Sequence, residues 1–286
     1  MTQTQSVPST RTPRRRRAVG GFVDGWNRIG VQTHFYGMTI RSISDALIHY
    51  RGEVATQIAQ MSLGTGALAV VGGTVVIVAF LTMSAGAIIA VQGYNQLAGV
   101  GVEALTGFAS AYINVRIIAP LVTGIGLAAT IGAGATAQLG AMRIAEEIDA
   151  LEVMGVRTVA YLASSRVLAG LIVVLPLYCV AVLMSFMAAR FGTTVVYGQS
   201  TGVYDHYFTT FLNPVDLLWS FVQAMAMALT VMVIHTYYGF TASGGPAGVG
   251  EAVGRAVRAS LIVVVFVTLA IPLAVYWQSG NFELSA

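Results

Sequence analysis

The sequence has little charge for its length. Only 9% of its 286 residues are Asp, Glu, Lys or Arg, whereas roughly a quarter of the residues of an ordinary soluble domain are charged. So few charges do not cover a water-facing surface, and 56% of the residues are hydrophobic. The apolar residues fall in long blocks rather than in the short periodic patterns of a globular core. The composition therefore argues against a soluble domain and predicts a protein that lies in a bilayer.

Lysine is absent and cysteine is nearly so. All 15 basic residues are arginines, and the one cysteine, Cys179, lies within an apolar block. A single thiol forms neither an intramolecular disulfide nor a paired-thiol metal site, so we interpret Cys179 as a small buried hydrophobe. The net charge of +3 does not indicate a nucleic-acid partner, because the arginines lie between apolar blocks. No GxxxxGK[ST] phosphate loop is present either, which excludes ATP hydrolysis by that route.

Five apolar blocks are each long enough for the roughly 20 residues that cross a hydrocarbon core. They belong to a domain at residues 61–286 and lie near residues 64–91, 117–140, 167–189, 215–237 and 259–278. The stretch 92–116 is less apolar and predicts short helices at the outer face. We therefore expect an all-α membrane protein with about five transmembrane helices.

Two segments precede these blocks. Residues 1–21 are rich in Ser, Thr, Pro and Arg, which is typical of disorder, and the short apolar run of a signal peptide does not follow them. Residues 22–60 carry Phe22, Trp26 and Ile29 at helical spacing, with arginines among their polar neighbours. This pattern predicts interfacial amphipathic helices in the cytoplasmic headgroup layer. A soluble linker helix is the alternative.

The arginines also predict the orientation. Positive charge is enriched in the cytoplasmic segments of membrane proteins, so the basic N-terminus is expected inside. With five spans, only Arg116 and Arg190 then fall outside. The odd number of spans places the C-terminus on the extracytoplasmic side.

Small residues recur along the second block. Every fourth position carries a small residue, and these are Gly124, Ala128, Gly132, Thr136 and Gly140. Such a stripe lets another helix backbone approach closely. We therefore expect this span to pack against protein rather than lipid.

The segment between the second and third blocks is acidic and amphipathic. Residues 142–156 read MRIAEEIDALEVMGV, which predicts one short helix with an apolar stripe and a separate face of carboxylates, closed by Gly155. Anionic lipid repels such a helix, which favours a protein partner that contacts Leu151 and Met154. A solvated loop helix fits the same pattern.

Residues 146–155, EEIDALEVMG, closely resemble the EExDALxxMG signature of the MlaE/YrbE permeases of Mce lipid transporters. The resemblance runs from about Phe22 to the C-terminus and includes QGY at 92–94. The run GIGLAATIGAGATAQLGAMR at 124–143 and HTYYGFTASGGPAGVG at 235–250 look like the YrbE B-type subunit of actinobacterial Mce systems. The chain departs from the Gram-negative relatives at Ile117, where those tend to carry an acid.

The resemblance implies a permease subunit of an ATP-driven lipid transporter in the bacterial inner membrane, importing fatty acids, sterols or related lipids. Its expected partners are a second YrbE permease, a cytoplasmic ATPase dimer and MCE-domain proteins on the outer face. The chain itself is not expected to be an enzyme or to bind a cofactor, since ATP and Mg²⁺ belong to the ATPase. The residues implied in ATPase coupling are Glu146, Glu147, Asp149, Leu151, Met154 and Gly155.

A lipid cavity is a second expectation from the resemblance, and it involves Gln92, Tyr94 and Glu103. Glu103 is the only ionisable carboxylate or base between Glu53 and Arg116. An isolated acid at membrane depth is usually functional, although a carboxylate also suits the outer headgroup layer. Interfacial anchoring is the alternative for Gln92 and Tyr94.

Other functions fit less well. A structural membrane anchor for MCE proteins would not need the acidic helix, and an intramembrane hydrolase needs a nucleophile and a base within hydrogen-bond reach.

His235 is either a proton-relay element or a histidine packed beside tyrosines at the cytoplasmic interface. His206 with Asp205 lacks a third metal ligand at a suitable spacing.

Overall fold

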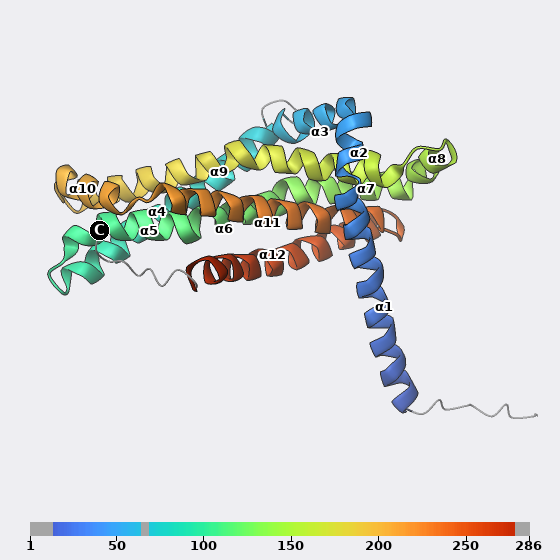
Figure 1. Ribbon diagram of the computed structural model, residues 1–286, viewed down its shortest axis with the longest axis horizontal. Helices are drawn as coiled ribbons and strands as arrows, with labels where there is room; N and C mark the ends of the chain where they lie inside the picture. Colours follow the sequence, from blue (N-terminus) through green and yellow to red (C-terminus); the bar gives the residue numbers. More distant parts are fainter. Residues whose placement is uncertain (1–13, 64–68, 278–286) are drawn as a thin grey trace, which may run out of the picture.

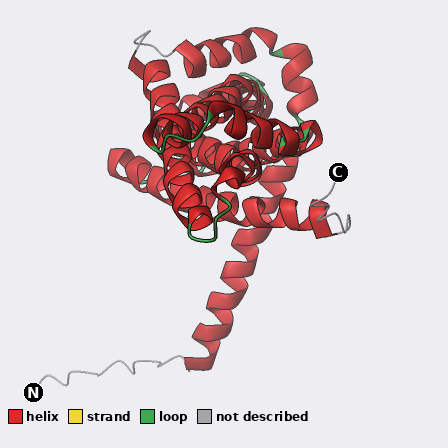
Figure 2. Cartoon of the chain, turned by 90° about the vertical axis from the view of Figure 1, so that its left-hand side faces the viewer, coloured by secondary structure: helices red, strands yellow, loops and turns green. Residues whose placement is uncertain are grey.

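The computed structural model describes residues 14–63 and 69–277, and the regular elements in these ranges are all helices (Figure 2). Three helices come first: α1 (Arg14–Arg41), α2 (Ile43–His49) and α3 (Arg51–Leu63). The long helices that follow form a bundle (Figure 1). Parts of three predicted segments lie outside the described residues, namely 1–13 of the tail, 64–68 of the first span and 278 of the last.

Five segments of the described chain are long and apolar enough to cross a membrane. They are Gly73–Ala98, Glu103–Ile144, Val159–Val196, Pro214–Phe240 and Gly245–Ala274. Each overlaps one of the five blocks predicted from the sequence. The prediction of an all-α protein with five membrane-spanning helices is confirmed.

The second and third spans are each assembled from consecutive helical pieces. The first span is α4 (Ala69–Ala98), and the second consists of η1 (Glu103–Leu105), α5 (Thr106–Ile113), η2 (Asn114–Ile118), α6 (Ala119–Leu127), η3 (Ala128–Gly132) and α7 (Ala133–Ile144). After α8 (Glu147–Val153), the third contains η4 (Val159–Ser164), α9 (Ser165–Phe191) and η5 (Gly192–Val196). The remaining helices are α10 (Thr201–Phe211), α11 (Pro214–Phe240) and α12 (Gly245–Trp277). The segments η2, η3, η4 and η5 are π-helical.

The stretch 92–116 does not form separate outer helices, and this part of the sequence prediction is wrong. Its first residues continue α4 to Ala98, and its last residues from Glu103 onward belong to the second span. The helices are therefore longer than the apolar blocks. Hydrophobicity marks the part of a helix at hydrocarbon depth, whereas the backbone hydrogen bonds continue into the headgroup region.

Local signals explain where helix α11 begins. Pro214 occupies its first position, where the missing N–H has no intrahelical partner to lose. The side chain of Asn213 caps the helix by accepting a hydrogen bond of 2.9 Å from the backbone N–H of Val215. Asp216 lies in the first turn, where a negative charge interacts favourably with the positive end of the helix dipole.

Helix α1 runs across the direction of the bundle helices, near the end that carries α8 (Figure 1). Phe35 is buried there and its ring lies 5.5 Å from those of Tyr237 and Phe240. If the bundle crosses a membrane, α1 lies along its plane, as an interfacial helix does. α1 begins at Arg14, so it takes in part of the segment 1–21 that the sequence assigned to a disordered tail. Arginine has good helix propensity, which allows the run of arginines to extend the helix.

The small-residue stripe of the second span lies in the interior of the bundle. Gly124, Gly132 and Gly140 are buried, and Ala128 and Thr136 are fully so. A Cβ atom on Gly124 would lie 3.0 Å from the sulfur of Met227, and one on Gly140 would lie 2.8 Å from Val249. The absence of side chains thus lets α11 and α12 contact this span directly.

Two other sequence predictions concern single residues in the bundle. His235 is fully buried, with Nδ1 2.7 Å from Thr136 Oγ1 and Nε2 3.2 Å from Ser260 Oγ. It therefore joins α7, α11 and α12 inside the bundle. Cys179, interpreted from the sequence as buried, is exposed on α9, because its position on the helix faces away from the bundle.

A charged pair joins the second and fourth spans at the end of the bundle opposite α8. Arg116 Nη2 lies 2.8 Å from Asp216 Oδ2, and both side chains are less than a fifth exposed. Arg116 also lies over the ring of Tyr112 at 4.0 Å and donates a hydrogen bond to its hydroxyl. Arg116, which has no acidic neighbour at position 117, thus forms its ion pair with a carboxylate on a different helix.

The glycine contacts predict opposite effects at two positions of one helix. A Cβ on Gly132 would lie 2.6 Å from the ring of His235, whereas nothing lies within 4 Å of a Cβ on Gly134. Gly132→Ala should lower the free energy of unfolding by about 1–3 kcal/mol through overpacking. Gly134→Ala should not lower it, since alanine favours the helix. Unfolding of the purified protein in detergent, followed by circular dichroism, measures both, and equal stability of the two variants would contradict the packing described.

Candidate functional site

Helix α8 forms the connection between the second and third spans and protrudes at one end of the bundle (Figure 1). The second span ends at Ile144, and the chain then turns through Glu146, whose φ of 59° is left-handed. Gly155, with a φ of 80°, turns the chain again after α8. The single helix predicted over 142–156 is therefore two helices. A residue in the left-handed region ends the run of right-handed dihedrals that a helix requires.

One face of α8 is anchored on the bundle. Ile148 is fully buried and packs with Leu139 of α7 and Leu162 of η4. Leu151, three residues later on the same face, is half-buried against this cluster, which also includes Phe240. The sequence predicted Leu151 as an outward contact for a partner. In the structure part of its side chain packs on the bundle, because the apolar stripe of α8 is used for attachment.

The opposite side of α8 is exposed. Val153 is 89% exposed and Met154 is 69% exposed at its C-terminal end. Glu146 and Glu147 are exposed at its N-terminal end. We call these four residues the α8 surface. It combines two carboxylates with two apolar side chains and projects beyond the bundle.

The other two carboxylates of α8 have partners within the chain. Asp149 forms an ion pair of 2.5 Å with Arg143 at the end of α7. Glu152 accepts a hydrogen bond of 2.9 Å from the hydroxyl of Thr158, just before η4. These contacts hold α8 to both spans that it connects. The negative charge directed away from the chain is therefore mostly that of the α8 surface.

The residues predicted for a lipid cavity lie at the opposite end of the bundle. Tyr94 stacks on Tyr197 with ring centroids 4.4 Å apart, and Gln92 is exposed on α4. Glu103 begins the second span and is half-buried, and its backbone oxygen accepts a hydrogen bond from Gln199 at 2.9 Å. Tyr94 and Glu103 thus both lie beside the end of the third span. None of the three predicted residues lines the pocket described next.

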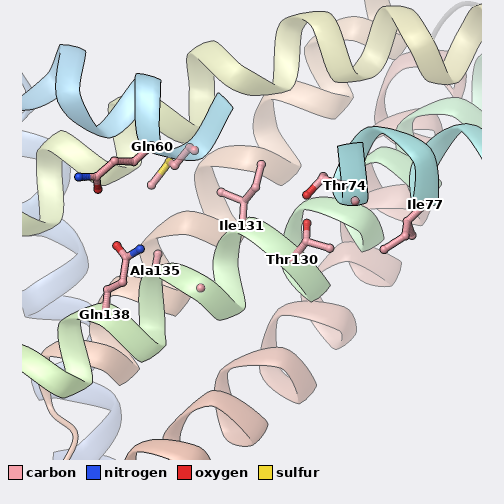
Figure 3. Close-up of a pocket in the computed structure, with 10 residues that line it drawn as sticks. Gln60, Thr74, Ile77, Thr130, Ile131, Ala135 and Gln138 are labelled. Atoms are coloured by element: carbon pink, nitrogen blue, oxygen red, sulfur yellow. The ribbon is translucent and has the colours of Figure 1, made fainter. Parts of the chain in front are cut away.

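A pocket of about 310 Å³ opens between α3, α4 and the η3–α7 part of the second span (Figure 3). The side chains of Gln60 and Gln138 lie at one end of it, and those of Thr74 and Thr130 lie toward the other. Apolar residues, Ile131 among them, complete the lining. No charged residue is part of the described lining.

The sequence contained a signal for this pocket that our reasoning missed. Thr130, Gly134 and Gln138 recur every four residues, just as the packing stripe does, but two positions out of step with it. Two residues turn a helix by roughly 200°, so the two stripes lie on opposite faces. One face packs inside the bundle and the other lines the pocket. The remaining walls come from α3 and α4, which no local pattern relates to the second span.

The Asp205 and His206 pair lies on α10, outside the five spans. Arg190 donates two hydrogen bonds to the carboxylate of Asp205, at 2.8 and 2.9 Å, and these lower its pKa. The neighbouring Tyr204 is buried, which raises its pKa to about 12, and its hydroxyl donates to Ser110. The carboxylate is therefore part of a structural ion pair at this end of the bundle.

Comparison with known proteins identifies the class. A family profile described as Permease MlaE matches residues 63–274, which include α8 and all five spans. The chain belongs to the MlaE family of permeases. A probable ABC transporter permease protein of Rickettsia bellii is 27% identical over 197 residues, covering 66% of this chain and 73% of that protein. One from Synechocystis is 31% identical over 157 residues, covering 52% and 57%.

A plant protein is similar to this chain as well. The Arabidopsis thaliana protein named TRIGALACTOSYLDIACYLGLYCEROL 1, chloroplastic, is 29% identical over 174 residues, which cover 60% of this chain and 49% of the plant protein. As an MlaE-family member, the chain is an ABC transporter permease and not itself the catalytic subunit. ATP hydrolysis in such a transporter is the work of partner ATPase subunits.

The anchoring of α8 leads to a local stability prediction. Ile148→Ala removes a fully buried side chain and should weaken the attachment of α8 by about 2–5 kcal/mol. Amide hydrogen exchange in residues 147–153 should then be much faster, while exchange in α11 stays slow. Val153→Ala is the matched control, because its side chain is exposed and surface changes usually shift stability by within about 0.5 kcal/mol. Equal exchange in the two variants would show that Ile148 is not the anchor.

Proposed function

We propose that the chain is the permease subunit of an ATP-driven lipid transporter and that the α8 surface is where its ATPase binds. The observation that carries this is the division of α8 into a buried face and an exposed one. Ile148 anchors the helix on the bundle, so the exposed apolar side chains of Val153 and Met154 are not required for its attachment. Exposed apolar groups beside carboxylates suit a protein contact, since an acidic surface is repelled by anionic lipid.

Lipid as the cargo is supported by the relatives. The name of the plant relative contains that of a galactolipid, and the matched family covers all five spans of this chain. The resemblance of residues 146–155 to the Mce permeases favours the Mce class and import. The resemblance of the runs 124–143 and 235–250 favours a YrbE B-type subunit that pairs with a second permease, with MCE-domain proteins on the outer face and ATP and Mg²⁺ held by the ATPase.

The proposed topology places α8 and the N-terminus in the cytoplasm. Arg143 and Arg157 flank α8 in the sequence, and Gly140 lies against Val249 of α12, so Arg255 and Arg258 follow at this end of the bundle. Arg116 and Arg190 belong to the other end. This distribution agrees with the enrichment of arginine in cytoplasmic segments.

The contacts of α8 suggest how force reaches the spans. Ile148 touches Leu139 on α7 and Leu162 on η4, while Asp149 is paired with Arg143. A displacement of α8 by a closing ATPase dimer would therefore be passed to the second and third spans together. The second span is packed against α11 and α12 through its small residues, so it would move with them as one body.

Docking is tested by changing only the α8 surface. The double variant Glu147→Arg with Val153→Asp reverses one charge and removes one apolar contact without touching Ile148. Loss of an interface hot spot costs about 2 kcal/mol or more, so the ATPase should bind about 30-fold more weakly. Co-purification and titration of the ATPase with the permease in nanodiscs measure this.

The matched control is Val203→Asp on α10, which is exposed but lies at the other end of the bundle. It should leave ATPase binding unchanged. Lipid uptake by cells carrying the double variant should fall with ATPase binding. Full uptake after complete loss of the ATPase would overturn the proposal in favour of a passive channel or a structural anchor for lipid-carrier proteins.

The topology is tested by labelling a single thiol. In a Cys179→Ala background, Glu147→Cys should react with a membrane-impermeant maleimide only after the cytoplasmic side is made accessible. Val203→Cys on α10 should react in intact cells, since α10 belongs to the opposite end. Reaction of Glu147→Cys in intact cells would show the opposite orientation and would rule out ATPase binding at the α8 surface.

A further inference from the structure

The pocket between α3, α4 and the second span is mostly apolar, and its polar side chains are uncharged. Its hydrogen-bonding side chains are two carboxamides, Gln60 and Gln138, and two hydroxyls, Thr74 and Thr130 (Figure 3). A carboxamide both donates and accepts hydrogen bonds. A phosphate, carboxylate or ammonium group would find no counter-ion in this lining, and burying an unpaired charge is strongly unfavourable.

The backbone beside the pocket is irregular at the same place. Thr130 and Ile131 belong to the π-helical segment η3, and such π-turns within α-helices are frequent at functional sites. The hydroxyl proton of Thr130 is already donated to the carbonyl of Gly126, at 2.6 Å. Thr130 therefore offers a ligand only an acceptor. A ligand that matches it must bring a hydrogen-bond donor, such as a hydroxyl group.

The pocket lies at the depth where an amphiphile changes from polar to apolar. Gln60 belongs to α3, which precedes the first span, and Thr74 is the sixth residue of α4. Gln138 lies less than two turns before the end of the second span at Ile144. The carboxamides thus stand near the headgroup layer at the α8 end of the bundle, with Ile77 and Ile131 deeper in the hydrocarbon.

The size of the pocket limits what it holds. Its 310 Å³ is at the lower end of the about 300–1,000 Å³ typical of ligand sites. It is about twice the volume of a cavity of about 150 Å³ that binds benzene. It therefore suits a small polar group and the first part of a chain or ring, with the rest of the lipid extending into the bilayer.

We propose that this pocket binds an uncharged amphiphile that carries a hydroxyl group. A polar group of the ligand hydrogen-bonds to the carboxamides of Gln60 and Gln138, a hydroxyl donates to Thr130 toward the other end of the pocket, and the apolar part contacts Ile77 and Ile131. The site is separate from the α8 surface and from the residues Gln92, Tyr94 and Glu103. Binding at this site requires no ATPase, so its test is independent of the test of ATPase docking.

The probe is a photoreactive monoacylglycerol, which is uncharged and carries both hydroxyls and an ester. With the full-length chain in phosphatidylcholine nanodiscs, it should label peptides of α3, α4 and α7. Unlabelled monoacylglycerol should compete about tenfold more strongly than the lysophosphatidic acid of the same chain length, because the phosphate has no partner in the pocket. Equal competition, or labelling confined to other helices, would overturn the proposal.

Two variants test the pocket itself. Gly134 lines it, and a Cβ there meets nothing within 4 Å, so Gly134→Leu extends a side chain from an unobstructed position into the pocket and should abolish labelling. Gly254→Leu on α12 is the matched control, since Gly254 is equally unobstructed but does not line the pocket. Gln138→Met keeps the length of the side chain and should weaken binding by about tenfold through lost hydrogen bonds. Wild-type labelling of Gly134→Leu would contradict the assignment.

Discussion

The close approach of three helices in the middle of the bundle is the constraint on which the other features depend. Gly132 leaves room for the ring of His235, which in turn bonds Thr136 and Ser260. Any side chain larger than hydrogen at position 132 would displace the ring. Between lipid-exposed helices there is no hydrophobic driving force of the kind that acts in water, so close packing and buried hydrogen bonds hold them together. The second span is fixed in this way along much of its length.

This fixed span serves two purposes on opposite faces. The packing stripe that contains Gly132 contacts α11 and α12, whereas the stripe that contains Thr130, Gly134 and Gln138 faces a pocket. A ligand in that pocket would touch the same helix that ends next to α8. Because that helix is packed tightly on its other side, it has little freedom to adjust alone. Any coupling between the pocket and α8 would therefore involve the bundle as a unit.

The α8 region shows how far a local pattern determines a site. The sequence located the acidic connection and named its carboxylates, and the structure places Glu146 and Glu147 outside. It did not determine which apolar residues face out. Leu151 and Val153 are both compatible with a partner contact in a helical projection, but only packing against the cluster of Leu139 and Leu162 decides that Leu151 is half-buried and Val153 exposed.

The sequence by itself determined the all-helical class, the five spans and the small-residue stripe, because hydrophobic length and spacing along one helix are local properties. Tertiary structure alone decided the Asp216 partner of Arg116, the burial of His235 and the pocket between Gln60 and Gln138. These features join residues that are tens of positions apart or more. Their meeting depends on which helices are neighbours and at what rotation, and no repeat within a single helix encodes that.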